Sequence, residues 1–223
     1  MSQFTEEQLR AIEQQLRCPS GDMGIEIGQR MNNTNKAMID NTIELLQLQA
    51  EETVLELGHG NGQHIHQLLE KATPIHYHGL DISNTMHEQA QHINQSLMEE
   101  HALKFQLYDG VKLPFEDNTF DKIMTVNTIY FWSEPAQLMQ ELGRVLKPQG
   151  RAIITFAHKS YMEAAATVGE LFTIVDKDDI QRLVEPTTLE VVEFVAAYDH
   201  TVNTLKQSVR RDFYLAILAG ENE

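Results

Sequence analysis

The amino-acid sequence predicts an α/β protein with a doubly wound, mostly parallel sheet of seven strands, the last of which is antiparallel. A short apolar stretch at residues 53–57 leads into the glycine-rich stretch 58–62, a pattern typical of a strand that enters a tight turn. Predicted strands and helices then alternate as far as residue 156, and a tail with two predicted strands and no helix between them follows. Alternation predicts parallel strands joined by crossover helices, whereas two successive strands pair most simply as an antiparallel hairpin.

The first predicted strand, Thr53–Leu57, is apolar enough to be covered on both faces of the sheet. Gly58, Gly60 and Gly62 then let the backbone turn sharply and approach a ligand closely. A helix is predicted to begin near Gln63, because the apolar residues behind it recur at helical spacing. The amides and the dipole at the start of such a helix favour negative charge, so this stretch predicts a nucleotide-type site.

The remaining elements follow from hydrophobic periodicity and from capping residues. Ser83 is placed to cap the helix after the second strand, and Pro135 suits the first turn of the helix after the fourth strand. The other predicted strands are residues 75–81, 103–108, 120–126, 152–156, 189–198 and 212–219, and a helix is predicted over residues 176–183.

The first part of the chain, residues 1–50, is predicted to form a helical cap ahead of the main domain at residues 51–223. A capping box at Thr5 starts one helix, and a second begins near residue 34. Between them, residues 23–33 are rich in glycine, methionine and asparagine, a composition that mobile lids and irregular loops share. Two interpretations stay open: a flexible cap over the ligand, and a helical pair that covers the sheet edge.

The acidic composition argues against nucleic acids and anionic membranes as binding partners. Acidic residues outnumber basic residues by 33 to 17, for a formal charge of −16, whereas nucleic-acid backbones and anionic lipids favour a basic surface. We therefore expect no nucleic-acid partner and no membrane insertion, and no apolar run is long enough to span a membrane. The single cysteine, Cys18, excludes an intramolecular disulfide and fits a reducing compartment, so with no signal peptide we expect a cytoplasmic protein.

Several histidines lie close together in the sequence without forming a metal-binding pattern. No cysteine joins them, and the usual zinc-type spacing is absent, so no metal site is predicted. His59 differs from the others because it lies inside the glycine turn. The histidines concerned are His59, His64, His66, His76 and His78.

The glycine spacing distinguishes two kinds of nucleotide site. A dinucleotide fingerprint is G-x-G-x-x-G, whereas this chain has Gly58, Gly60 and Gly62 with Glu56 two residues ahead. That pattern resembles the E-x-G-x-G-x-G signature of class I S-adenosylmethionine-dependent methyltransferases. The resemblance, which extends over residues 56–150, implies their Rossmann-like fold, in which the seventh strand lies antiparallel beside the fifth.

Further residues follow the predicted strands, where ligand contacts are expected. Asp81 ends the second strand, and its carboxylate can accept hydrogen bonds from both ribose hydroxyls of this cofactor or of NAD; it could instead cap a helix. By resemblance, Asp109 accepts from the adenine amine, although Asp-Gly is also a common turn pair. The cofactor-binding set is Glu56, Gly58, His59, Gly60, Asn61, Gly62, Asp81, Ile82, Met86, Asp109, Gly110, Val111 and Asn127.

The acceptor is expected beyond the fourth and fifth strands. Tyr130 and Trp132 follow the fourth strand, where aromatic rings could surround a sulfonium, shape an acceptor pocket or simply pack in the core. His158 and Tyr161 follow the fifth strand, and a histidine there could take a proton from a hydroxyl acceptor or be an exposed loop residue. The catalytic candidates are therefore His158, Tyr130 and Tyr161.

The resemblance implies methyl transfer from S-adenosylmethionine to a small-molecule acceptor by in-line displacement. Such chemistry depends mainly on positioning, and a general base is needed only if the acceptor must lose a proton. Two alternatives stay open: a nicotinamide-dependent oxidoreductase, and a protein that binds the cofactor without transfer. A homodimer also stays open.

Overall fold

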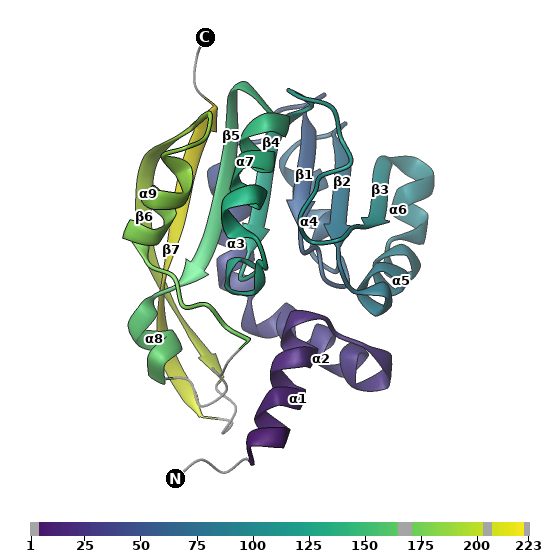
Figure 1. The fold of residues 1–223 in the computed structure, drawn as a ribbon. Coiled ribbons are helices and arrows are strands. Elements are labelled where there is room, and N and C mark those ends of the chain that lie inside the picture. The colour runs from purple at the N-terminus through teal and green to yellow at the C-terminus, as the bar shows by residue number, and fades with distance from the viewer. Residues whose placement is uncertain (1–4, 165–170, 203–206, 221–223) are drawn as a thin grey trace.

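One mixed sheet organises the residues that a computed structural model describes, which are residues 5–164, 171–202 and 207–220 (Figure 1). Its strand order is β3-β2-β1-β4-β5-β7-β6, with β1 to β5 parallel to one another and β7 antiparallel to both β5 and β6. The predicted fold is confirmed. The strands are β1 (Thr53–Leu57), β2 (His76–Asp81), β3 (Ala102–Leu107), β4 (Phe120–Val126), β5 (Leu146–Ala157), β6 (Leu189–Val202) and β7 (Ser208–Gly220).

Helices cover both faces of the sheet and also lie beyond the carboxyl ends of its central strands (Figure 1). Thr5 forms the predicted capping box, Ser83 accepts a hydrogen bond from the backbone N–H of Met86, and Pro135 is the first residue of its helix. The helices are α1 (Glu6–Arg17), α2 (Gly21–Thr34), α3 (Lys36–Leu46), α4 (Ile65–Lys71), α5 (Asn84–Ile93), α6 (Gln95–Glu100), the 3-10 helix η1 (Ile129–Phe131), α7 (Pro135–Val145), α8 (Lys159–Ala164) and α9 (Lys177–Val184).

The buried apolar residues form one cluster on each face of the sheet. Successive strand residues alternate between the clusters: Val54 belongs to the cluster that contains α3 and α4, and Leu55 to the one that contains α7 and α9. Both residues are fully buried, as expected for a parallel strand covered on both faces. No helix in the described part of the chain has the length and apolar character to cross a bilayer.

Residues 23–33, for which a flexible cap and a helical pair at the sheet edge both stayed open, belong to helix α2. Its glycines make room for close packing: a Cβ at Gly24 would lie 2.7 Å from the carbonyl carbon of Pro19, and one at Gly28 would lie 2.8 Å from the Sδ of Met86. The contact of Gly28 with Met86 joins segments that are distant in sequence, so composition alone does not reveal it. Helices α1 and α2 lie beyond the carboxyl ends of the central strands (Figure 1).

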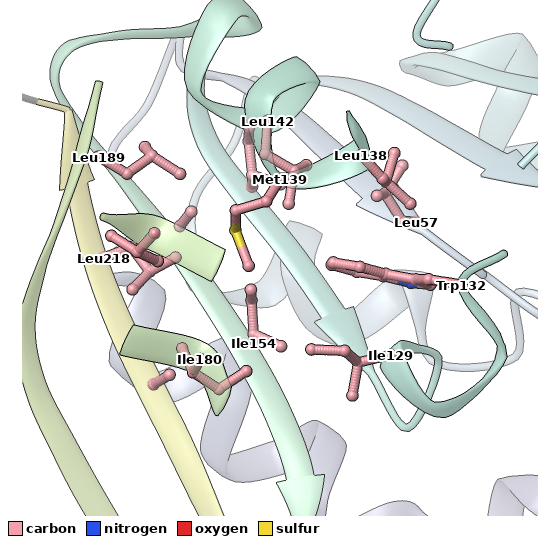
Figure 2. Packing of buried hydrophobic residues seen from close by; sticks show 14 of the residues in the cluster. Leu57, Ile129, Trp132, Leu138, Met139, Leu142, Ile154, Ile180, Leu189 and Leu218 are labelled. Atoms are coloured by element: carbon pink, nitrogen blue, oxygen red, sulfur yellow. The ribbon is translucent and has the colours of Figure 1, made fainter. Parts of the chain in front are cut away.

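Met139 belongs to α7 and lies at the centre of the buried cluster between this helix and the sheet. Its thioether points toward the sheet (Figure 2). Because the side chain is fully buried, Met139→Ala should lower the free energy of unfolding by about 2–5 kcal/mol. Urea denaturation measures the change. Val192→Ala, at a side chain that is 58% exposed, is the control and should change stability by less than about 0.5 kcal/mol. Equal effects of the two substitutions would contradict this packing.

Candidate functional site

A cavity of about 360 Å³ opens at the carboxyl ends of β1, β2, β4 and β5. The cap helices, the glycine turn and the loop after β4 all contribute to its wall. Eleven of the thirteen residues predicted to bind the cofactor line it, as do Tyr130 and Tyr161. Those eleven are Glu56, Gly58, His59, Gly60, Asn61, Asp81, Ile82, Met86, Asp109, Gly110 and Asn127.

The glycine turn combines close packing with an open face. Gly58, Gly60 and Gly62 all have positive φ, a conformation that side chains with a Cβ rarely adopt. A Cβ at Gly58 would lie 2.4 Å from the Cγ2 of Thr128, whereas one at Gly60 would meet no atom within 4 Å. Gly60 therefore borders the open space that a ligand needs. Gly62 does not line the cavity, since it packs against the side chain of Asn94.

The carboxylate of Asp81 faces this open space from the end of β2. Its Oδ2 accepts from the N–H of Gly60 at 3.0 Å, and its Oδ1 accepts from the N–H of Ser83 at 2.8 Å. Burial raises the pKa of Asp81 above its ordinary value, although these hydrogen bonds oppose the shift. Each oxygen keeps a lone pair for a further donor, so the group fits a ribose with two hydroxyls.

Glu56 lies beneath the turn in a buried ion pair. Its Oε2 accepts from the Nε2 of His64 at 2.9 Å and from the hydroxyl of Tyr77 at 2.5 Å. Burial alone would raise the pKa of Glu56, but the neighbouring His64 lowers it below its ordinary value. Burial alone would likewise lower the pKa of His64, but Glu56 raises it. The geometry therefore favours a charged pair that anchors α4 to β1.

His59 stays neutral within the glycine turn. Its Nδ1 donates to the carbonyl of Gly60 at 2.7 Å, and its ring packs edge-on against Phe105. The buried Nε2 has no hydrogen-bond partner among the described residues. Burial lowers the pKa of His59, which suits a ring enclosed by the sheet.

Asp109 shapes a turn and also lines the cavity. The side chain is exposed, and its Oδ1 accepts from the N–H groups of Val111 and Lys112, each at 2.8 Å, so it shapes a turn. These hydrogen bonds lower the pKa of Asp109. The residue also lines the cavity beside Gly110, whereas Val111 does not.

Asn127 lies where the turn after β4 meets the cap. Its backbone is left-handed, with φ of 57°, a conformation that asparagine tolerates better than most residues. Its Nδ2 donates to the Oδ1 of Asn35 at 3.0 Å, and its Oδ1 accepts from the hydroxyl of Tyr130 at 3.2 Å. Both hydrogen bonds fix the orientation of the amide inside the cavity.

Aromatic and thioether side chains surround the other end of the cavity. The ring of Phe131 lies 4.6 Å from that of Phe172, which also contacts Tyr130. The hydroxyl of Tyr130 accepts from the N–H of Ala157, and burial raises the pKa of Tyr130 well above its usual range. The wall at this end is formed by Met31, Tyr130, Phe131, Trp132, Tyr161, Met162 and Phe172.

The structure separates the two candidates that follow β5. Tyr161 lines the cavity, and burial raises the pKa of its phenol. His158 is not among the lining residues: its Nδ1 accepts from the N–H of Ser160 in α8, and its ring contacts Tyr214. A catalytic role for His158 therefore finds no support in the geometry of the cavity.

Sequence reasoning missed lining residues from both ends of the chain. Thr34 and Asn35 lie at the junction of α2 and α3, and Arg211 lies on β7. No motif marks them, because they reach the cavity through contacts between distant segments. The described residues include no group of three or more histidine, cysteine, aspartate and glutamate side chains that could hold a metal.

The Glu56–His64 pair predicts a pH dependence of stability. Because folding lowers the pKa of Glu56, this residue stabilises the folded state at pH values above its ordinary pKa of 4.5. That stabilisation is lost as the pH falls through the pKa of the folded state. Because the pKa of His64 is raised, its contribution is present below the ordinary value of 6.5 and is lost as pH rises through the folded pKa. The pair therefore stabilises the fold most between pH 4.5 and 6.5.

His64→Gln should accordingly destabilise the protein most within that window and progressively less at higher pH. Urea denaturation over a pH series measures the difference from wild type. His66→Gln, at the exposed histidine two residues along the same helix, is the matched control. A difference for His64→Gln that does not vary with pH would show that the charged pair is not its cause.

Comparison with known proteins agrees with this geometry. The sequence model of a family described as "Methyltransferase domain" matches residues 55–154, which include the glycine turn, Asp81, Asp109 and Asn127. The chain is 27% identical over 130 residues to the uncharacterized methyltransferase YdaC of Bacillus subtilis, covering 57% of this chain and 68% of that protein. It is 29% identical over 173 residues to methyltransferase GfsG of Streptomyces halstedii, covering 74% of this chain and 62% of that protein.

Among solved structures, the fold is similar to a chain of the complex between the Haloferax volcanii Trm112 methyltransferase activator and a methyltransferase. The TM-score is 0.71 at 16% identity, covering 88% of this chain and 95% of that chain, which establishes a likeness of fold. The aligned segments span about two thirds of the two curated relatives, at 68% and 62% of their lengths. Residues 55–154 therefore match a methyltransferase domain, and the comparisons support a class I S-adenosylmethionine-dependent methyltransferase with S-adenosylmethionine as the cofactor.

Proposed function

We propose that the protein methylates a small, largely apolar metabolite. The observation that carries this proposal is that one cavity joins the cofactor residues around Gly60 and Asp81 to a wall of aromatic and thioether side chains. When bound, S-adenosylmethionine supplies an electrophilic methyl group on a positively charged sulfur. The chain has to bind the acceptor, orient it and exclude water, and such positioning can supply roughly 7–11 kcal/mol of the barrier.

The two ends of the cavity suit different ligands. Acidic side chains gather at the cofactor end, where Glu56, Asp81 and Asp109 lie. The acceptor end offers rings and thioethers, which favour an apolar or ring-bearing molecule. The formal charge of −16 supports a metabolite over a nucleic acid as the acceptor.

No side chain at the acceptor end is placed to remove a proton at neutral pH, within the part of the cavity that the structure describes. The titratable phenols there are Tyr130 and Tyr161, and burial raises the pKa of each. Both therefore stay protonated and can donate hydrogen bonds but cannot act as bases. We infer that the acceptor reacts through an atom that is already free of its proton, such as an ionised oxygen or an uncharged nitrogen.

Two alternatives can be tested against this proposal: a nicotinamide-dependent oxidoreductase, and a protein that binds the cofactor without methyl transfer. Asp81 would suit NAD as well as S-adenosylmethionine, so a nicotinamide-dependent enzyme is distinguished by binding. A protein that binds the cofactor without transfer is distinguished by incubation with S-adenosylmethionine that carries a labelled methyl group and a fraction of small metabolites. Label should enter a low-mass product, and cofactor binding without any labelled product would favour the binding protein.

Replacement of Asp81 should weaken cofactor binding. In isothermal titration with S-adenosylhomocysteine, Asp81→Ala should lower affinity on the order of tenfold to a hundredfold, because ribose hydroxyls and two backbone N–H groups lose a charged acceptor. Asp117→Ala is the control, since Asp117 is exposed and pairs with Arg144 away from the cavity. Binding of NAD by the wild type, with none of S-adenosylhomocysteine, would reject the proposed cofactor site.

The absence of a base among the described acceptor-end residues predicts a pH profile set by the acceptor. The test compares two acceptors whose pKa values differ. For each acceptor kcat/KM should rise with pH, and the two curves should be displaced along the pH axis by the difference between the acceptor pKa values, because the enzyme phenols stay protonated. Tyr161→Phe should leave the shape of each profile unchanged. One break at the same pH for both acceptors would instead reveal a base on the enzyme.

A further inference from the structure

A buried ion pair connects the terminal hairpin to the cavity wall. Asp199 on β6 and Arg211 on β7 are direct partners in the antiparallel register. The Nε of Arg211 donates to the Oδ1 of Asp199 at 3.1 Å, and its Nη2 donates to the Oδ2 at 2.6 Å. Arg211 is 4% exposed and lines the cavity. The two parallel hydrogen bonds hold the guanidinium plane in one orientation.

The same guanidinium reaches the carboxyl-terminal end of α2. Its Nη2 donates to the backbone carbonyl of Thr34 at 2.6 Å, and its Nη1 lies 3.5 Å from the Oδ1 of Asn35. Carbonyls in the last turn of a helix lack partners within the helix, and the helix dipole makes this end negative. Arg211 therefore satisfies an open carbonyl and places its positive charge where the dipole favours it.

A chain of hydrogen bonds continues from Asn35 across the cavity wall. The Oδ1 of Asn35 also accepts from Asn127, whose own Oδ1 accepts from the hydroxyl of Tyr130. That hydroxyl in turn accepts from the N–H of Ala157 at the end of β5. Every residue from Arg211 to Ala157 in this relay lines the cavity.

We infer that Arg211, oriented by Asp199, is a positioning residue for methyl transfer. It acts through Asn35 to fix the Asn127 amide and the Tyr130 hydroxyl, both of which line the cavity. The inference rests on the proposed function for its catalytic consequence. Arginine suits this place because its planar fork serves a carboxylate, a carbonyl and an amide oxygen together, which a lysine ammonium cannot do in the same geometry.

The hairpin also carries a matched control. Arg210 and Asp212 form an ion pair on β7, and the Arg210 guanidinium lies over the ring of Tyr198, which is 59% exposed. Neither member of this pair lines the cavity. The two pairs share one strand and the same chemistry, so only the Asp199–Arg211 pair should influence the relay.

Two series of variants test the inference. Arg211→Lys keeps the positive charge but loses the planar guanidinium with its several donors. Asp199→Asn removes the carboxylate charge that orients Arg211. Asn35→Ala breaks the relay and leaves the Asp199–Arg211 ion pair in place. Their controls are Arg210→Lys, Asp212→Asn and Asn33→Ala, the last at an exposed neighbour of Asn35.

Trp132, the one tryptophan of the chain, gives a local signal because it lines the cavity and its Nε1 donates to Thr128, next to Asn127. In all three relay variants, its fluorescence emission should shift to longer wavelength as water enters the loosened wall. Hydrogen exchange in residues 31–39 should become about tenfold faster, as expected for the loss of hydrogen bonds to a charged group. The three controls should match the wild type in both measurements.

The kcat for the labelled-methyl assay should fall at least tenfold in the three relay variants. Their affinity for S-adenosylhomocysteine should fall less than that of Asp81→Ala, because Asp81 and the glycine turn stay intact and only the amide of Asn127 is loosened. If the assay finds no acceptor, the proposed function fails, but emission and exchange still decide the inference. Relay variants that match their controls would overturn it. The inference would also be overturned if Arg211→Lys made hydrogen exchange faster throughout the sheet while Asn35→Ala left exchange unchanged. The Asp199–Arg211 pair would then only stabilise the fold.

Discussion

The carboxylate of Asp81 holds together the parts of the chain from which the cavity is built. One oxygen accepts from the N–H of Gly60, in the turn after β1, and the other accepts from the N–H of Ser83, at the start of α5. The hydroxyl of Ser83 donates in turn to the carbonyl of Pro19, which links α1 to α2. The turn, the helix start and the cap therefore depend on one buried anion at the end of β2, which burial would otherwise disfavour.

Under the proposed function, the residues that line the cavity suit two different ligands. Three carboxylates lie at the cofactor end, of which Glu56 is already paired with His64. The acceptor end presents rings, thioethers and phenols that stay protonated. A positively charged sulfur is favoured near the anionic end, and an apolar acceptor is favoured against the rings. The reaction can then depend on position rather than on a protein nucleophile.

Differences between expectation and structure have identifiable causes. The hairpin strands β6 and β7 are longer than predicted, because pairing with each other extends both of them beyond the apolar stretch. Residues 23–33 lie in a helix, in which Gly24 and Gly28 allow close packing against Pro19 and Met86. His158 was considered as a base from its position after β5, yet its ring bonds to the backbone of α8.

The sequence by itself determined what depends on neighbouring residues. The strand before Gly58, the glycine spacing with Glu56, and the carboxylate at the end of β2 are all local patterns, so the fold and most of the cavity residues around the glycine turn could be predicted from them.

Only the tertiary structure decided the acceptor end. Arg211 bonds to Thr34, 177 positions away, and Asn127 bonds to Asn35 across 92 positions. Such contacts arise when cap, sheet and hairpin pack together, and neither periodicity nor residue type encodes which distant groups will meet. Burial also raises the pKa of Tyr130 and of Tyr161, since the loss of water around a phenol disfavours its charged form.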